Sequence, residues 1–225
     1  MCGRYFLHST ADKLAQLFGE MPMPVLDARY NIAPTQPVPV VRQNPAARRE
    51  MVLVRWGLIP SWSKGPDSRY SMINARAETV AQKPAYRSAF RYRRCLIPAD
   101  GFYEWRATPG GKQPYVLRAR DGGPMALAGL WEHWQDADGN ELESCTVLVR
   151  QANAQVRDIH ERMPVVVAPE SFDLWLDIHA QKPQPIEALL AAQQTPELAI
   201  YPVSRAVNNP RATAPGLIEP LEQGH

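Results

Sequence analysis

Apolar and polar residues alternate with the period of a β-strand along much of the chain. Residues 49–55 alternate in this way and are matched by residues 38–42 across an Asn44-Pro45 turn, which predicts a hairpin. Three further runs, at 115–120, 125–131 and 142–149, are separated by turns rich in Asp and Gly and predict a meander. Short strands at 4–7 and 198–203 complete the expected sheet.

Helical periodicity is confined to short stretches of the chain. The Ser-Thr pair at 9–10 caps a helix with Leu14 and Phe18 on its apolar face, and Gly19 ends it. Further helices are expected to run up to Phe90, over 151–158, from Pro169, and near 186–192. The sequence therefore predicts an α+β fold, in which a curved antiparallel sheet or partial barrel is flanked by short helices.

The length favours one domain. The chain has 225 residues and no shift in composition that would divide it, so we expect a single domain over residues 1–225. Its core is expected at about 2–209, followed by a flexible tail at 210–225. The 22 prolines agree with many short strands and turns rather than long helices.

Composition and charge exclude several classes of protein. A net charge of +2 argues against a protein that coats nucleic acid by bulk electrostatics. The three cysteines, at 2, 95 and 145, are widely spaced, so we expect neither a disulfide framework nor a metal site, and no cofactor. No apolar run reaches the length of a signal peptide or membrane span. We therefore expect a cytoplasmic protein without a membrane partner.

Cys2 is the first candidate for chemistry. Removal of Met1 would leave a residue with a free α-amine, of pKa about 7.7–8.0, beside a thiol of pKa about 8.5. Such a 1,2-aminothiol condenses with an aldehyde to an imine, and the thiol then closes a five-membered thiazolidine ring. Two alternatives stay open: a small residue that begins a strand, or the nucleophile of an N-terminal-nucleophile hydrolase.

Glu104 is the second candidate. It is the one carboxylate in an aromatic strand, between Tyr103 and Trp105, and burial there would raise its pKa into the range of a general acid or base. Simple alternation would instead put Glu104 on the solvent face. His160, in a polar loop before the apolar run 165–167, is a further acid/base candidate, with a surface histidine as the alternative.

Three other features suggest contacts with a nucleic acid. Asn74 and Arg76 stand two apart, so in an extended segment their side chains point the same way. Trp62 lies in a loop rich in Gly and Pro, where an aromatic ring can stack on a base. Four arginines at 87, 91, 93 and 94 offer planar donors for phosphate, unless they form a solvated helix face or structural ion pairs.

Eight motifs in fixed order make the pattern specific. They are Met-Cys-Gly-Arg at 1–4, Tyr-Asn-Ile-Ala-Pro at 30–34, Trp-Gly-Leu-Ile-Pro-Ser-Trp at 56–62, Ile-Asn-Ala-Arg-Ala-Glu at 73–78, Pro-Ala-Asp-Gly-Phe-Tyr-Glu-Trp at 98–105, Ala-Gly-Leu-Trp-Glu at 128–132, Ile-His-Glu-Arg-Met-Pro at 159–164 and Pro-Val-Ser at 202–204. This set closely resembles the SOS-response-associated peptidase family, whose members crosslink to abasic sites in single-stranded DNA. The resemblance runs from Cys2 to about Asn209.

The resemblance implies a covalent capture reaction. The processed Cys2 would take the ring-opened aldehyde as a thiazolidine and shield the lesion, in a monomer that is nucleoid-associated when engaged with DNA. Asn74 would orient the Cys2 amine and the sugar, and Glu104 would move protons during imine formation and release. His160 would assist ring opening of the deoxyribose.

The same resemblance implies a DNA-binding set. Arg76 would hold the phosphate beside the lesion, while Arg4 and Arg162 match positions on the DNA backbone. Pro34 and Trp62 match the surfaces that stack on the strand and splay it.

Two positions depart from the family pattern. Arg150 stands in a segment where the family usually has a threonine-containing turn, so it would add a phosphate contact or alter access. Ser63 stands where some relatives carry a second aromatic residue. Both departures bear on DNA affinity rather than on the catalytic set.

Other activities also follow from the resemblance. The constellation could cut its own Met1, reverse the crosslink by hydrolysis, or act as an AP lyase through β-elimination from the imine. Two rivals from other classes remain: an N-terminal-nucleophile amidase, which needs an oxyanion hole, and a noncatalytic single-stranded DNA-binding module.

Overall fold

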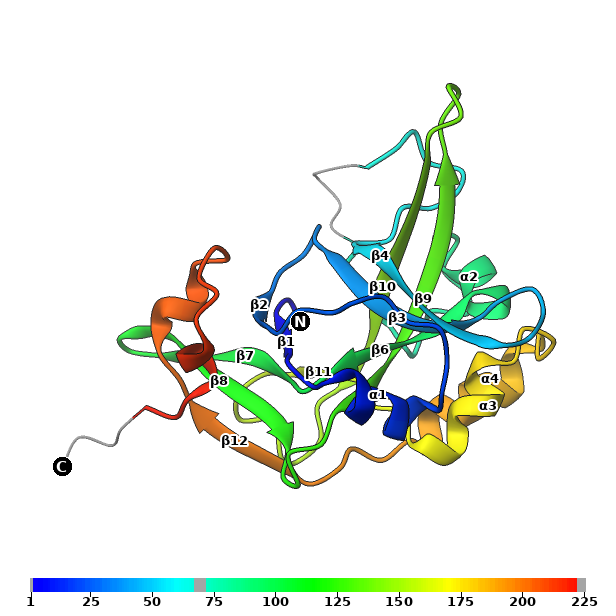
Figure 1. Cartoon of the computed structure of the whole chain (residues 1–225). Helices are drawn as coiled ribbons and strands as arrows, with labels where there is room; N and C mark the ends of the chain where they lie inside the picture. The colour runs from blue at the N-terminus through cyan, green and yellow to red at the C-terminus, as the bar shows by residue number, and fades with distance from the viewer. Residues whose placement is uncertain (1, 67–71, 222–225) are drawn as a thin grey trace.

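Two β-sheets share one hydrophobic core in the computed structural model, which describes residues 2–66 and 72–221 (Figure 1). The five-stranded sheet has the order β12-β8-β7-β1-β2. Its strands are β1 (Tyr5–Leu7), β2 (Arg29–Ile32), β7 (Gly101–Thr108), β8 (Gly111–Ala119) and β12 (Leu198–Pro202). The three-residue strand β1 thus lies inside the sheet, paired with β7 on one side and β2 on the other.

The second sheet closes on itself. It has the order β11-β10-β4-β3-β6-β9, and β9 pairs again with β10, so five of its strands form a small barrel. The strands are β3 (Pro37–Gln43), β4 (Arg49–Trp56), β5 (Asn74–Arg76), β6 (Arg94–Ala99), β9 (Met125–Gln135), β10 (Glu141–Gln151) and β11 (Arg162–Pro164). The predicted hairpin is confirmed, since β3 pairs β4 over seven residues. The predicted three-strand meander is only partly correct: β9 pairs β10, but β8 lies in the other sheet, paired with β7 and β12.

The barrel sheet is mixed, although most of its pairs are antiparallel as expected. Strand β10 runs parallel to β4 and to β5, while the other strand pairings among the described residues are antiparallel. The parallel pairs arise because the chain returns to β10 after long connections, which no local turn signal announces. The α+β class with a partial barrel is confirmed.

Short helices cover the barrel, and α3 and α4 lie together at one end of the molecule (Figure 1). The helices are α1 (Ala11–Phe18), α2 (Arg87–Tyr92), α3 (Phe172–Leu176) and α4 (Pro183–Ala192), with 3-10 turns at Pro169–Ser171, Arg205–Asn208 and Pro215–Ile218. The caps of α1 are as predicted: the Thr10 hydroxyl accepts from the Lys13 amide, and Gly19 ends the helix at φ +85°. Within residues 2–66 and 72–221, no helix has the length and apolarity needed to cross a membrane.

The helix predicted over 151–158 is wrong. This segment is the end of β10 followed by turns, in which the Asn153 side chain accepts from the backbone amide of Gln155. An asparagine that bonds its own backbone in this way competes with helix formation. The segment therefore delivers His160 from a turn rather than from a helix.

The segment after residue 209 also differs from the expected flexible tail. Leu217 is buried, Pro220 bridges to Val203, and the Tyr201 hydroxyl donates to the carbonyl oxygen of Ile218 at 2.9 Å. Residues 210–221 are thus tied to the five-stranded sheet, because Leu217 completes a small apolar cluster there. Residues 222–225 lie outside the described part of the chain.

Two of the four clustered arginines have structural roles. The buried Arg94 guanidinium donates to carbonyl oxygens of Phe90, Trp175 and Asp177, so it joins α2 to the end of α3. Burial lowers the pKa of Arg94 to about 10. Arg93 pairs with Glu132 at 2.8 Å. The structural alternative for these two arginines is therefore the correct one.

Gly101 follows Asp100 in the sequence motif at 98–105. It begins β7 and lies between the Phe6 ring of β1 and the Leu117 carbonyl oxygen of β8. A Cβ atom there would stand 2.3 Å from Cζ of Phe6 and 2.8 Å from the carbonyl oxygen of Leu117. A side chain at this position would push β1 away from β7, so the site's geometry depends on a glycine here.

We expect Gly101→Ala to lower the free energy of unfolding by about 2 kcal/mol or more, because overpacked cores cost that much. Gly216→Ala is the matched control, since the nearest atom to its added Cβ is a side-chain oxygen at 3.6 Å. The control should change stability by less than about 0.5 kcal/mol. Urea unfolding of both variants makes the comparison, and equal midpoints would contradict the packing argument.

Candidate active site

Cys2 is held at the start of β1 in the interior of the protein. Its side chain is fully buried, and Nδ2 of Asn74 donates to its carbonyl oxygen at 2.9 Å. Asn74 is the first residue of β5, which pairs with Val147 of the buried strand β10. The barrel thereby fixes the position of Cys2 through Asn74.

The register of β1 against β7 brings Glu104 next to Cys2. Tyr5 pairs with Phe102, and the Tyr103 amide donates to the Arg4 carbonyl oxygen at 3.0 Å. Continuing this antiparallel register puts residues 2–4 beside 103–105. Burial, with the nearby Glu104 charge adding to it, raises the pKa of the Cys2 thiol well above its ordinary value.

Glu104 is buried, not on the solvent face. Only 2% of its surface is exposed, and burial raises its pKa to about 7. A carboxyl group with this pKa exchanges its proton near neutral pH, as the aromatic neighbours in the sequence predict. The site therefore contains a group that can both accept and donate a proton.

His160 faces Glu104, with 4.0 Å between its Nε2 and Oε2 of the carboxylate. The backbone amide of Arg162 donates to its Nδ1 at 2.9 Å. The same nitrogen lies 3.1 Å from the Arg162 carbonyl oxygen, so the backbone of Arg162 holds the ring with Nε2 toward Glu104 in either tautomer of the neutral ring. Burial lowers the pKa of His160, which favours this neutral form.

A cleft of about 360 Å³ opens beside these two groups. Six residues line it: Arg4, Glu104, Trp105, Lys112, His160 and Asn208. Arg4 is fixed there by two hydrogen bonds from Nη1, one to Asn31 Oδ1 at 2.6 Å and one to the carbonyl oxygen of Val207 at 2.8 Å. The cleft thus has an acid/base pair at its wall and positive charge around it, which suits an anionic ligand.

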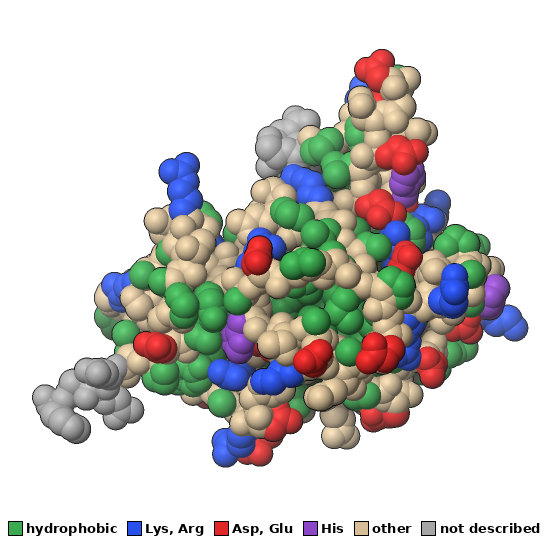
Figure 2. Space-filling model, in the orientation of Figure 1, with side chains coloured by type: hydrophobic (Ala, Val, Ile, Leu, Met, Phe, Trp, Pro, Cys, Tyr) green, Lys and Arg blue, Asp and Glu red, His purple; other side chains and the backbone are tan. Residues whose placement is uncertain are grey.

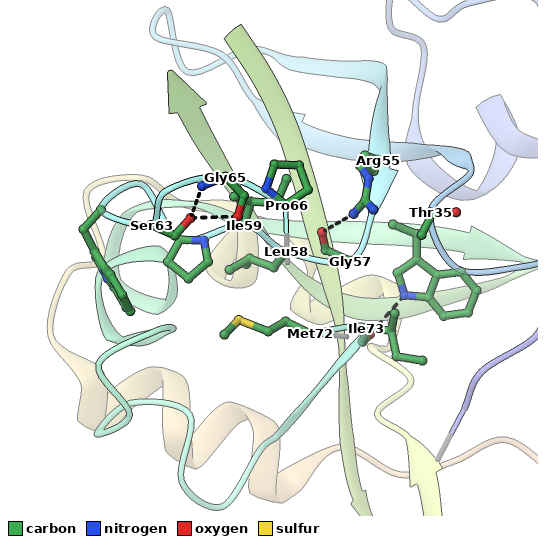
Figure 3. A pocket seen from close by; sticks show the side chains of 13 residues that line it. Thr35, Arg55, Gly57, Leu58, Ile59, Ser63, Gly65, Pro66, Met72 and Ile73 are labelled. Carbon is green, nitrogen blue, oxygen red and sulfur yellow. Dashed lines mark hydrogen bonds between the residues drawn. The ribbon is translucent and has the colours of Figure 1, made fainter. Parts of the chain in front are cut away.

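A second and larger cavity, of about 550 Å³, is lined by Met72 and Ile73, the residues before Asn74, among others (Figure 3). Leu58 and Met72 point into it, and Trp62, 69% exposed, stands at its rim. Trp56 is buried and donates from its indole to the carbonyl oxygen of Ile73 at 3.0 Å. Since Ile73 precedes Asn74, this apolar cavity and the Cys2 carbonyl are linked through adjacent residues.

The other predicted site residues lie on several different elements of the fold. Arg76 is exposed at the end of β5, and Pro34 is half-buried in the turn between β2 and β3. Arg162 begins β11, next to His160, and is paired with Glu78. Arg150 lies apart, in another cleft, where its guanidinium donates to the carbonyl oxygen of Gln193 and to Thr195 Oγ1. The guanidinium of Arg150 thus already donates hydrogen bonds within the protein.

The sequence reasoning missed two residues at these surfaces. Lys112 lines the cleft with Glu104 and His160 and arrives there from β8, a position that only the β7–β8 hairpin register reveals. Trp134, from the β9–β10 hairpin, donates from its indole to the carbonyl oxygen of Ser63 at 2.9 Å. The loop that carries Trp62 is therefore supported by a second tryptophan from a distant strand.

The hairpin of β9 and β10 ends in a negatively charged tip. Figure 2 shows acidic side chains gathered there, and the tip carries Asp136, Asp138 and Glu141. Like charges repel, so an anionic ligand is excluded from the tip and favoured at the cleft. Among the described residues, no group of three or more His, Cys, Asp and Glu side chains lies together as a metal site would require.

Comparison with known proteins gives a consistent result. The family model for SOS response associated peptidase (SRAP) matches residues 1–210. The chain is 38% identical to the abasic site processing protein YoqW of Bacillus subtilis, over 97% of this chain and 99% of that protein. It is 32% identical to the abasic site processing protein HMCES of Gallus gallus, over 87% and 67%. A crystal structure of a Bacteroides thetaiotaomicron protein shares the fold, with a TM-score of 0.84 at 24% identity, over 98% of this chain and all of that one.

Glu104→Gln should stabilise the protein, and more so at higher pH. The folded-state pKa of about 7 lies above the ordinary value of 4.5, so the folded protein binds the proton more tightly than the unfolded chain. Stability from this group is complete below pH 4.5 and is lost as the pH rises to about 7. Glutamine does not titrate, so its advantage should grow over that window, to about 3 kcal/mol.

Urea unfolding of both proteins between pH 4 and pH 8 measures this difference, because the other groups titrate in both and cancel. A difference that stays constant with pH would mean that the pKa of Glu104 is not raised by folding.

Proposed function

The chain belongs to the SOS response associated peptidase (SRAP) family, and from this premise we propose that it recognises abasic sites in single-stranded DNA and captures them covalently through Cys2. The observation that carries the proposal is the setting of Cys2, with Asn74 on its carbonyl oxygen and the protonatable Glu104 beside it. Two relatives are named abasic site processing proteins, which supports the choice of substrate.

Capture begins with the removal of Met1, by initiator-methionine processing or by the site itself, because the nitrogen of Cys2 is a peptide nitrogen until then. The ring-opened form of an abasic site has an aldehyde at C1′. The Cys2 amine adds to this carbon and expels one water to give an imine. The sulfur then adds to the imine carbon, the thiol proton moves to the nitrogen, and a thiazolidine closes. The net by-product is one molecule of water.

Glu104 and His160 divide the proton transfers. Glu104, ionised in part near neutral pH, takes a proton from the Cys2 amine and returns it when the hydroxyl leaves as water. His160, when protonated, donates a proton to the ring oxygen of the deoxyribose while the C1′ hydroxyl releases one to water, so the ring opens to the aldehyde. Asn74 holds Cys2 in place through its carbonyl oxygen, which keeps the amine near the aldehyde.

The DNA strand is bound by cations and aromatic surfaces around this centre. Arg4 and Lys112, which line the cleft, bind phosphates together with Arg76 and Arg162. Trp62, at the apolar cavity, stacks on a base, and Pro34 is a second surface that splays the strand. Arg150 does not bind a phosphate in this proposal, because its guanidinium already donates to Gln193 and Thr195.

The same chemistry implies side activities. The imine acidifies the adjacent carbon, so β-elimination at the lesion is an AP lyase side reaction. Hydrolysis of the thiazolidine, with Glu104 and His160 moving the protons, reverses the crosslink. Peptide cleavage is limited to Met1 in this proposal.

Incubation of the protein with a single-stranded oligonucleotide that has one abasic site should give a species of lower mobility on a denaturing gel. An oligonucleotide with a tetrahydrofuran residue, which has no aldehyde, should give none. Cys2→Ala should abolish the species, and Asn74→Ala should slow its formation about 10-fold or more, because the amine is no longer positioned. Retention of full crosslinking by Cys2→Ala would overturn the proposal.

The same variant separates the rival functions. A noncatalytic binding module would form no denaturant-resistant species in either protein and would bind the strand equally well without Cys2. An N-terminal-nucleophile amidase would cleave small amides without DNA.

The rate of crosslinking should depend on the ionisation of Glu104. If its carboxylate is the active form, the ratio of the wild-type rate to the Glu104→Gln rate rises as the pH passes from about 6 to 8, around a pKa of about 7. Ionisation of the Cys2 amine affects both proteins and cancels in the ratio. We expect a plateau of about 100-fold, in the range found for general bases. A ratio that is flat or falls with pH would rule out the base role.

A further inference from the structure

Arg162 is already paired before any DNA is present. Its Nη1 donates to Oε1 of Glu78 at 2.6 Å, and the same oxygen accepts the backbone amide of Gln151 at 3.2 Å. Burial opposes the ionisation of Glu78, but hydrogen bonds from the backbone and from Arg162 outweigh it and hold its pKa below the ordinary value. The group that occupies Arg162 is therefore a carboxylate with a full negative charge.

The pair lies at the end of β10, close to Arg76. Glu78 follows Arg76 by two residues at the end of β5, and β5 runs parallel to β10 with Arg76 beside Val149. Two residues further along β10, Gln151 pairs with Arg162 of β11. The carboxylate thus shares one edge of the barrel sheet with both of the arginines that the proposed function assigns to phosphates.

We propose that Glu78 stands in for a DNA phosphate on Arg162, so that a strand has to displace this carboxylate before Arg162 can bind it. The inference rests on the proposed function, because it takes Arg162 as a phosphate contact. Carboxylate and phosphate oxygens compete for the same guanidinium donors. Glu78 therefore acts as a specificity-determining residue that weakens binding to intact strands.

Displacement is feasible because the pair is partly exposed. The side chain of Arg162 is 21% exposed and that of Glu78 is 47% exposed, and ion pairs of this kind are weak and exchangeable. A cleft of about 320 Å³ lies beside the pair, lined by Glu78, Gln151 and Arg150 among others. The released carboxylate thus has room to move into this cleft.

The consequence differs for intact and damaged strands. An intact strand is held by non-covalent contacts alone, so competition from Glu78 lowers its occupancy directly. An abasic strand is retained by the covalent bond to Cys2, so the same competition delays its capture but does not reverse it. Glu78 would in this way bias the protein toward lesions without touching the reacting atoms.

The test is a salt titration of the full-length protein with a fluorescent, undamaged single-stranded oligonucleotide. Glu78→Gln should bind roughly 3-fold more tightly or better at low salt, near the upper end expected from the loss of one surface ion pair. Its plot of log affinity against log NaCl concentration should be steeper by about 0.7, the slope for one more phosphate contact on a single strand. In an Arg162→Gln background, Glu78→Gln should give no gain.

Asp173→Asn is the matched control. Asp173 pairs with Arg49 at the same distance of 2.6 Å, on α3, so this variant removes an equal charge from an equivalent pair elsewhere. It should leave both the affinity and the slope unchanged. Thermal melting of every variant confirms that each one is folded.

Three results would overturn the inference: no gain or a weaker affinity with Glu78→Gln, an equal gain with Asp173→Asn, or a gain that persists without Arg162. Crosslinking of the abasic oligonucleotide, measured in parallel, distinguishes a failure of the Glu78 inference from a failure of the proposed function. If the wild type crosslinks and Glu78→Gln shows no gain, the inference alone fails. If the wild type neither crosslinks nor binds the strand, the proposed function fails, and the inference with it.

Discussion

The pairing of β1 on both of its edges is the constraint on which the site depends. A strand of three residues has little stability of its own, yet β1 is fixed by β7 on one side and β2 on the other, with Tyr5 and Phe6 fully buried. The pairing aligns the start of the chain with Glu104, and the hydrogen bond from Asn74 to Cys2 joins it to the barrel. A chain start that would otherwise fray is thereby held to one position, which a reactive terminal residue requires.

Burial then sets the chemistry at this position. It raises the pKa of Glu104 to about 7, so this carboxyl exchanges its proton near neutral pH, and it lowers the pKa of His160, which favours the neutral imidazole. The arginines differ in how the protein holds them: Arg4 at the cleft is fixed by Asn31, Arg162 is paired with Glu78, and the buried Arg94 donates to carbonyl oxygens of α2 and α3. With a net charge of only +2, affinity for a strand depends on which arginines are free to bind it, not on total charge.

Local signals in the sequence predicted much of the fold. The Asn44-Pro45 hairpin, the pairing of β9 with β10 and both caps of α1 depend on neighbouring residues, and all are present. The third strand of the expected meander, β8, pairs with β7 and β12 in the other sheet instead. The parallel partners of β10 and the packing of Leu217 depend on residues far apart in the chain, so no local pattern carried them. The helix expected over 151–158 failed because side-chain hydrogen bonds of Asn153 favour a turn.

The candidate site shows the same division. Motifs located Cys2, Asn74, Glu104 and His160, and the structure brings these four residues together. Lys112 and Trp134 were missed because they reach the site from other strands, and their own neighbours give no sign of it. The partner of Arg162 was missed for the same reason, since Glu78 and Arg162 are 84 residues apart.

Intact-mass spectrometry of the adduct, combined with thiol alkylation, tests most directly whether Cys2 captures the aldehyde as a thiazolidine. The account predicts a mass equal to the protein without Met1 plus the abasic oligonucleotide, less one water. It also predicts that iodoacetamide, applied to the denatured adduct, modifies Cys95 and Cys145 but not Cys2. An adduct in which the Cys2 thiol is still alkylated would show an open imine instead of a thiazolidine, and an adduct that retains Met1 would contradict the account altogether.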